Sequence, residues 1–177
     1  DDPININDPE HPGQTIKSTG RREVAKAMNM VLDQDLASGF ELQANPKDVI
    51  FVYGFASNPF MEIGSASGND PAGLKGLAQY LASSTHNGGT NMFGGVERAL
   101  RFLFYEQPDK TCSLAIIVLT DGDSNEGPAA SEFEGIYEGF VNETGLRIPV
   151  YAIPFGLNVN VDQLSVFTIT GGGPILD

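Results

Sequence analysis

Three short runs of apolar, β-branched residues, each closed by turn residues, predict strands at Asp48–Phe55, Leu114–Leu119 and Ile148–Pro154. Two further stretches, Met61–Ile63 and Pro174–Leu176, predict shorter strands. The run Leu114–Leu119 is apolar at every position. Such a run is typical of a strand that is buried on both faces of a parallel sheet, between covering helices.

Apolar residues spaced three and four positions apart predict helices between these strands. The predicted helices are Arg21–Ala37, Pro71–Ser83 with Asp70 as its N-cap, Phe93–Tyr105, Ala130–Asn142 and Val161–Val166. Strands that alternate with helices predict an α/β fold, namely a doubly wound, mainly parallel, Rossmann-like sheet with helices on both faces. We expect the three long strands to be parallel neighbours in that sheet.

The domain organisation follows from composition along the chain. Residues 1–20 are rich in Pro, Asn, Asp and Gly without a period, which predicts an irregular N-terminal segment. Residues 21–177 have the length of a single domain. Because the sequence begins abruptly at Asp1, we expect this domain to be part of a longer protein.

The charge balance is strongly acidic, with 10 Lys and Arg against 23 Asp and Glu and a net charge of −13. This balance argues against nucleic acid as a partner, because phosphate binding needs clustered cations, and it is compatible with cation binding. No apolar stretch approaches the roughly 18 residues of a membrane-spanning helix, so we expect no transmembrane segment in this chain. The single cysteine, Cys112, is expected to pack as a small hydrophobe beside a strand.

Candidate chemistry gathers where predicted strands end and a helix begins. Asp121 directly follows the strand Leu114–Leu119 and Thr120, while Gly88, Gly89 and Thr90 precede a helix. Open α/β sheets bind their ligands at the carboxyl ends of the strands. From position alone, Asp121 could equally shape the strand-to-loop turn, and Thr90 taken alone is more typical of a residue that merely caps the helix.

The order and spacing of five segments resemble the von Willebrand factor A domain over about residues 21–177. The segments are Val52–Ser57, Gly88–Leu100, Ile116–Gly127, Val150–Gly156 and Thr170–Gly172. The runs Ala27–Val49 and Glu62–Leu74 look most similar to bacterial members, including envelope and solute-binding-type proteins. That resemblance implies an extracytoplasmic or cell-surface location.

The resemblance also implies a metal-ion-dependent adhesion site. In this family a divalent cation, here expected to be Mg²⁺, sits at the carboxyl ends of the strands, and the metal positions map onto Thr90 and Asp121. An open coordination position would accept an acidic side chain of a protein ligand. The family's Asp-x-Ser-x-Ser motif at the end of the first strand is not recognisable before Arg21. We therefore expect Mg²⁺ binding to be weak or absent in this chain, because Mg²⁺ gives up its waters reluctantly.

Three functions remain open at this point. The chain is a protein-binding adhesion module, a structural domain with a vestigial site in an envelope protein, or a metal-dependent phosphotransfer enzyme that uses Asp121. The enzyme reading lacks a visible nucleophile, base or phosphate loop, so we expect no catalysis. The exposed-loop carboxylates Asp123 and Glu126 are expected to be solvated, and His11 and His86 lack zinc-site spacing.

Overall fold

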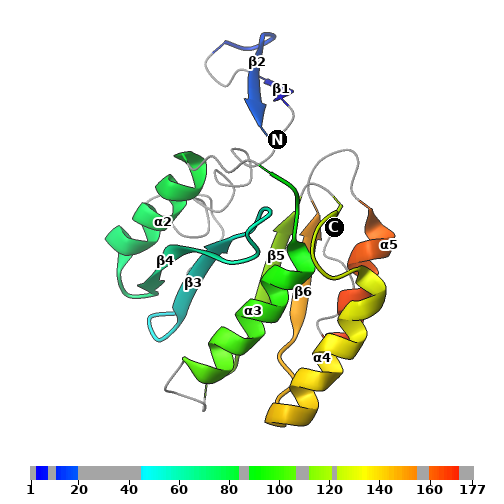
Figure 1. The fold of residues 1–177 in the computed structure, drawn as a ribbon. Helices are drawn as coiled ribbons and strands as arrows, with labels where there is room; N and C mark the ends of the chain where they lie inside the picture. Colours follow the sequence, from blue (N-terminus) through cyan, green and yellow to red (C-terminus); the bar gives the residue numbers. More distant parts are fainter. Residues whose placement is uncertain are drawn as a thin grey trace. The chain divides into compact units, whose positions relative to one another are not determined.

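The computed structural model describes residues 3–7, 11–19, 45–83, 88–106, 112–120, 123–154 and 160–171, which belong to two compact units (Figure 1). One unit comprises residues 1–53 and 62–85, and the other comprises residues 54–61 and 86–177. The predicted helix Arg21–Ala37 and the predicted strand Pro174–Leu176 lie outside the described residues. A single domain over residues 21–177 stays a prediction.

The N-terminal segment contains two strands where the composition predicted irregular chain. Strand β1 (Pro3–Asn7) pairs antiparallel with β2 (Thr15–Thr19), and Ile6 lies opposite Ile16 in the register. Isoleucine and threonine favour extended backbone, and Gly13, at a φ of 90°, lies in the turn between the strands. The apolar alternation is only two isoleucines long in β1, so the surrounding Pro, Asp and Asn obscured it.

In the first unit, a strand pair packs against one helix. Strand β3 (Val49–Gly54) pairs with β4 (Met61–Ser67), and helix α2 (Pro71–Ser83) follows. The predicted N-cap is confirmed, because the Asp70 carboxylate accepts a hydrogen bond from the Gly73 N–H at 3.0 Å. Among the described residues of this unit, the two strands and the helix contribute the buried apolar side chains, which are Val52, Ala66, Leu74 and Leu77.

The second unit is built on one pair of parallel strands. Strand β5 (Ile116–Thr120) lies beside β6 (Val150–Pro154), with Val118 opposite Ala152. This confirms that two of the three long strands are parallel neighbours. The described strands form three two-stranded sheets, namely β1–β2, β3–β4 and β5–β6. A single doubly wound sheet is therefore not shown. The sequence predicted these elements and the β5–β6 pairing, but not the pairing of β3 with β4.

Two helices lie side by side against the β5–β6 pair (Figure 1). They are α3 (Met92–Tyr105) and α4 (Ala130–Thr144), and the short α5 (Val161–Leu164) continues into the 3₁₀ helix η1 (Ser165–Thr170). Their aromatic side chains meet in one buried cluster, made of Phe93, Phe133, Tyr137 and Phe167.

Two predictions of burial are wrong. Strand β5 was expected to be buried on both faces, yet Ile117 is 60% exposed while Val118 is 4% exposed. Successive side chains of a strand point to opposite faces, and the described elements cover one face of β5. Cys112 was expected to be buried beside the strand but is exposed, because it precedes β5 in an irregular segment.

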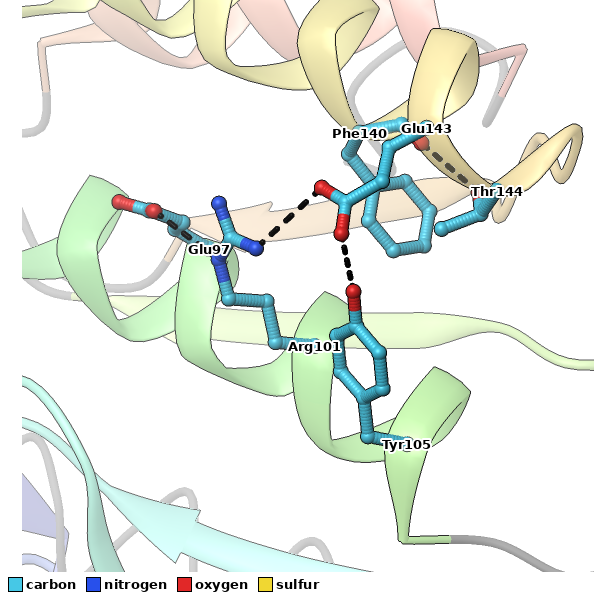
Figure 2. Close-up of polar contacts among 6 residues, drawn as sticks. All are labelled: Glu97, Arg101, Tyr105, Phe140, Glu143 and Thr144. Carbon is cyan, nitrogen blue, oxygen red and sulfur yellow. Dashed lines mark hydrogen bonds and ion pairs between the residues drawn. The ribbon is translucent and has the colours of Figure 1, made fainter.

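The exposed sides of α3 and α4 are joined by polar contacts (Figure 2). Arg101 lies 3.3 Å from the Glu97 carboxylate on its own helix and 3.5 Å from the Glu143 carboxylate on α4. The Tyr105 hydroxyl also donates to Glu143, and this hydrogen bond is the main reason that the pKa of Tyr105 is raised. All these groups are accessible to water, so the contacts contribute little to stability.

Tyr137 is the buried polar link between α4 and the end of the chain. Its hydroxyl lies 3.1 Å from the Ile148 carbonyl oxygen and 3.3 Å from that of Thr170, and burial is the main reason that its pKa is raised. We expect Tyr137→Phe to lower the free energy of unfolding by about 1–2 kcal/mol, because two buried carbonyls lose their donor. Urea denaturation measures the change. Tyr105→Phe, at an exposed hydroxyl, is the matched control, and equal effects of the two substitutions would contradict the buried role.

Candidate functional site

The predicted site residue Thr90 lies on a turn, residues 88–91, that leads into α3. Thr90 does not cap the helix. The N-cap is Asn91, whose side-chain oxygen accepts a hydrogen bond from the Gly94 N–H at 3.2 Å. The Thr90 side chain is therefore not needed to begin the helix, and the capping interpretation of this residue is wrong.

The loop that follows β5 holds the Thr90 backbone. The Thr90 N–H donates to the Asn125 side-chain oxygen at 2.7 Å. In return, the backbone N–H groups of Asn125 and Glu126 donate to the Thr90 carbonyl oxygen at 2.9 Å and 3.1 Å. Two loops that are far apart in the sequence are thus paired through both backbone polar groups of one residue, Thr90.

Ser124 adds a second set of contacts between the same loops. Its hydroxyl donates to the Thr90 carbonyl oxygen at 3.1 Å and accepts from the Met92 N–H at 3.2 Å. Its own N–H donates to the Gln163 side-chain oxygen at 2.9 Å, which connects α5 to the loop. The loop after β5, the turn before α3 and the helix after β6 are therefore tied together.

The loop that follows β3 contacts the other side of the turn. The Ser57 hydroxyl accepts a hydrogen bond from the Gly89 N–H at 2.8 Å, and the Ala56 carbonyl accepts from the Asn91 N–H at 2.9 Å. Gly88 has a φ of +124°, and a Cβ atom there would lie 2.4 Å from the Ser57 hydroxyl oxygen. This position thus requires glycine for backbone conformation and for space.

Of the two predicted metal ligands, the structure describes Thr90 but not Asp121. Thr90 is half-buried, and its hydroxyl has no hydrogen-bond partner among the residues that the structure describes. Asp121 lies outside the described residues, so its distance from Thr90 stays a prediction. Asp121 follows the buried end of β5 at Thr120 and precedes Ser124 by three residues, a span of at most about 11 Å.

The donor set suits a hard cation but is small. Within residues 45–83, 88–106 and the other described ranges, no three His, Cys, Asp or Glu side chains are grouped as metal ligands. A hydroxyl without a protein partner is an oxygen ligand of the type that Mg²⁺ accepts. Asp123 and Glu126 are exposed, as expected for a solvated loop. The Glu126 carboxylate nevertheless packs against Gly89, so a Cβ atom added at position 89 would clash with this carboxylate.

Sequence reasoning missed the residues that organise this region, namely Ser57, Asn91, Ser124, Asn125 and Gln163. The available signal was weak. Four of them are small polar residues close to a strand end or a helix start, where side chains commonly bond to backbone groups. Their partners lie more than thirty positions away in most cases, and single-sequence patterns do not pair such distant residues.

In the described part of the chain, none of the helices has the length and apolar character needed to cross a bilayer. This finding agrees with the prediction made from hydropathy for that part of the sequence.

Comparison with known proteins gives a distant and partial similarity. No family model matches this chain. The chain is 32% identical over 108 residues to inter-alpha-trypsin inhibitor heavy chain H3 of Mesocricetus auratus. It is 31% identical over 107 residues to the Mus musculus protein of the same name, and 31% identical over 108 residues to that of Homo sapiens.

Each of these matches covers 58% of this chain but 12% of the relative, so the chain spans about an eighth of the length of the curated relatives. The relatives are mammalian and give no support to a bacterial origin. Their names describe a heavy chain of an inhibitor, and none of the three names an enzyme.

Proposed function

We propose that this chain is a protein-binding module of von Willebrand factor A type that binds an acidic side chain of a protein ligand through a divalent cation held by Thr90 and Asp121. The observation that carries the proposal is the pattern of hydrogen bonds at Thr90. Its backbone N–H and carbonyl are both bonded to the loop after β5, whereas its hydroxyl has no partner among the described residues.

The chemistry of the proposed ligands fits Mg²⁺. A threonine hydroxyl and an aspartate carboxylate supply hard oxygen atoms, and a bound Mg²⁺ would offer an open position to a carboxylate of the partner. The chain carries a net charge of −13, which repels acidic partners at long range. A cation held by Thr90 and Asp121 would offset this repulsion locally. Two protein ligands make a weak site, so we propose low Mg²⁺ affinity.

The role proposed is binding without turnover. The partial similarity to an inhibitor heavy chain supports a non-enzymatic protein, and the resemblance supports an extracytoplasmic or cell-surface location. Nucleic acid is not proposed as a partner, because the chain has 10 Lys and Arg against 23 Asp and Glu.

A pair of substitutions at Thr90 tests the proposal. Thr90→Val replaces the hydroxyl by a methyl group of similar size, and Thr90→Ser keeps an oxygen at the same position. We expect wild-type protein to bind Mn²⁺, used as a paramagnetic substitute for Mg²⁺, with millimolar affinity by electron paramagnetic resonance. Thr90→Val should lose at least about tenfold in affinity and Thr90→Ser less, because a ligand is removed only in the first.

The same variants separate binding from folding. Because the Thr90 hydroxyl has no described protein partner, Thr90→Val should change the free energy of unfolding by less than about 0.5 kcal/mol. Asp121→Ala should weaken Mn²⁺ binding in parallel. Wild-type protein that binds no Mn²⁺ would leave a structural domain with a vestigial site as the better description, and equal binding by wild type and Thr90→Val would exclude Thr90 as a ligand.

A further inference from the structure

We infer that Asn125 and Ser124 are positioning residues, which fix the Thr90 peptide so that its hydroxyl is presented to a ligand. This inference rests on the proposed function, because it assigns a purpose to the loop contacts around the same threonine. Neither residue belongs to the two positions that the resemblance assigns to the metal.

The contact of Asn125 with Thr90 is reciprocal. The Asn125 side-chain oxygen accepts from the Thr90 N–H at 2.7 Å, and the Asn125 N–H donates to the Thr90 carbonyl at 2.9 Å. Two hydrogen bonds in opposite directions restrict rotation about both sides of the Thr90 α-carbon. One such bond would leave the residue free to turn about it.

Ser124 holds the residue at which α3 begins. The first N–H groups of a helix have no partner within the helix and need an outside acceptor. The first residue of α3, Met92, finds that acceptor in the Ser124 hydroxyl at 3.2 Å, and the same hydroxyl donates to the Thr90 carbonyl at 3.1 Å. Ser124 thereby sets the direction in which the chain leaves Thr90 and enters the helix.

The distribution of contacts at Thr90 distinguishes a positioning role from a general packing role. Its backbone takes part in four hydrogen bonds to the loop after β5, and all of them come from Ser124, Asn125 or Glu126. Its hydroxyl takes part in none among the described residues. A ligand group held this way has already lost the backbone freedom that binding would otherwise remove.

The decisive variants differ at the Asn125 side-chain oxygen. Asn125→Leu removes the acceptor at similar size, and Asn125→Asp keeps an acceptor for the Thr90 N–H. Asn142→Leu is the matched control, because Asn142 is exposed on α4. Ser124→Ala tests the second contact. Amide hydrogen exchange of Thr90 and Met92 is followed by NMR in cation-free protein, and Mn²⁺ affinity is measured by electron paramagnetic resonance.

We expect Asn125→Leu to speed exchange of the Thr90 amide by about tenfold, while Asn125→Asp retains its protection and Asn142→Leu has no effect. Ser124→Ala should speed exchange at Met92. Both Asn125→Leu and Ser124→Ala should weaken Mn²⁺ binding by at least about tenfold, as is typical when the support of a metal ligand is removed.

The outcomes separate the inference from the proposed function. Wild-type protein that binds Mn²⁺, together with an Asn125→Leu variant that binds it equally well, overturns the positioning role and leaves the proposed function standing. Unchanged exchange at Thr90 in Asn125→Leu also overturns the positioning role. Wild-type protein that binds no Mn²⁺ overturns the proposed function itself, and the positioning role toward a ligand falls with it.

Discussion

Replacing Phe133 by alanine should lower the free energy of unfolding of the second unit, which contains β5 and β6, by about 3–5 kcal/mol. This is the largest loss of stability that we expect from a single substitution. Phe133 is 0% exposed, and its ring centre lies 5.4 Å from that of Phe93 and 5.1 Å from that of Phe167. The ring therefore connects α4 to α3 and to η1. Its removal leaves a cavity that three separate elements cannot close by small shifts.

Equilibrium denaturation in urea, followed by circular dichroism, measures this loss. Phe133→Leu retains most of the buried volume and should cost less than the alanine substitution. Val161→Ala serves as a control because Val161 is 53% exposed, and it should change stability by less than about 0.5 kcal/mol. A loss below about 1 kcal/mol for Phe133→Ala would show that the aromatic cluster does not hold these elements together.

Gly127→Ala should lower the free energy of unfolding by about 2 kcal/mol and disturb the turn that carries Thr90. Gly127 has a φ of +76°, where alanine is strained by roughly 1 kcal/mol. A Cβ atom at Gly127 would also lie 1.9 Å from the Asn91 side-chain oxygen. That oxygen is bonded to the Gly94 N–H as the N-cap of α3, so moving it away costs about 1 kcal/mol more.

Gly135→Ala provides a control of opposite sign. Gly135 lies in α4, is exposed, and has nothing within 4 Å of the position of a Cβ atom. Alanine should therefore stabilise the helix by about 0.5–1 kcal/mol, because it loses less backbone entropy on folding. Thermal denaturation compares the two variants. If Gly127→Ala is as stable as Gly135→Ala, the close approach of Gly127 to Asn91 is not a constraint on the fold.

Local patterns in the sequence predicted most of the described elements. The apolar face of Pro71–Ser83 and the preceding Asp70 predicted α2 with its bounds and its cap. The predicted helix at Phe93–Tyr105 differs from α3 by one residue. These predictions succeeded because helix propensity, capping and amphipathic spacing all act within a few residues of the chain.

Predictions that depended on distant partners were less complete. Strand β3 was recognised from its sequence, but its pairing with β4 was not, because strand character does not specify a neighbour. Thr90 was singled out by its place before α3, yet Asn91 one residue later provides the cap. Both are small polar residues, and only the path of the backbone decides which of them faces the first turn.

The sequence by itself determined where most of the described strands and helices form, that the chain is acidic, and that Thr90 and Asp121 follow glycine-marked or strand-ending turns. Those properties are local or additive, so they can be read in chain order. The tertiary structure alone decided that Ser124 and Asn125 hold the Thr90 backbone while its hydroxyl stays without a described partner. The reason is that a hydrogen bond between residues thirty-five positions apart depends on how β5 and α3 are placed together.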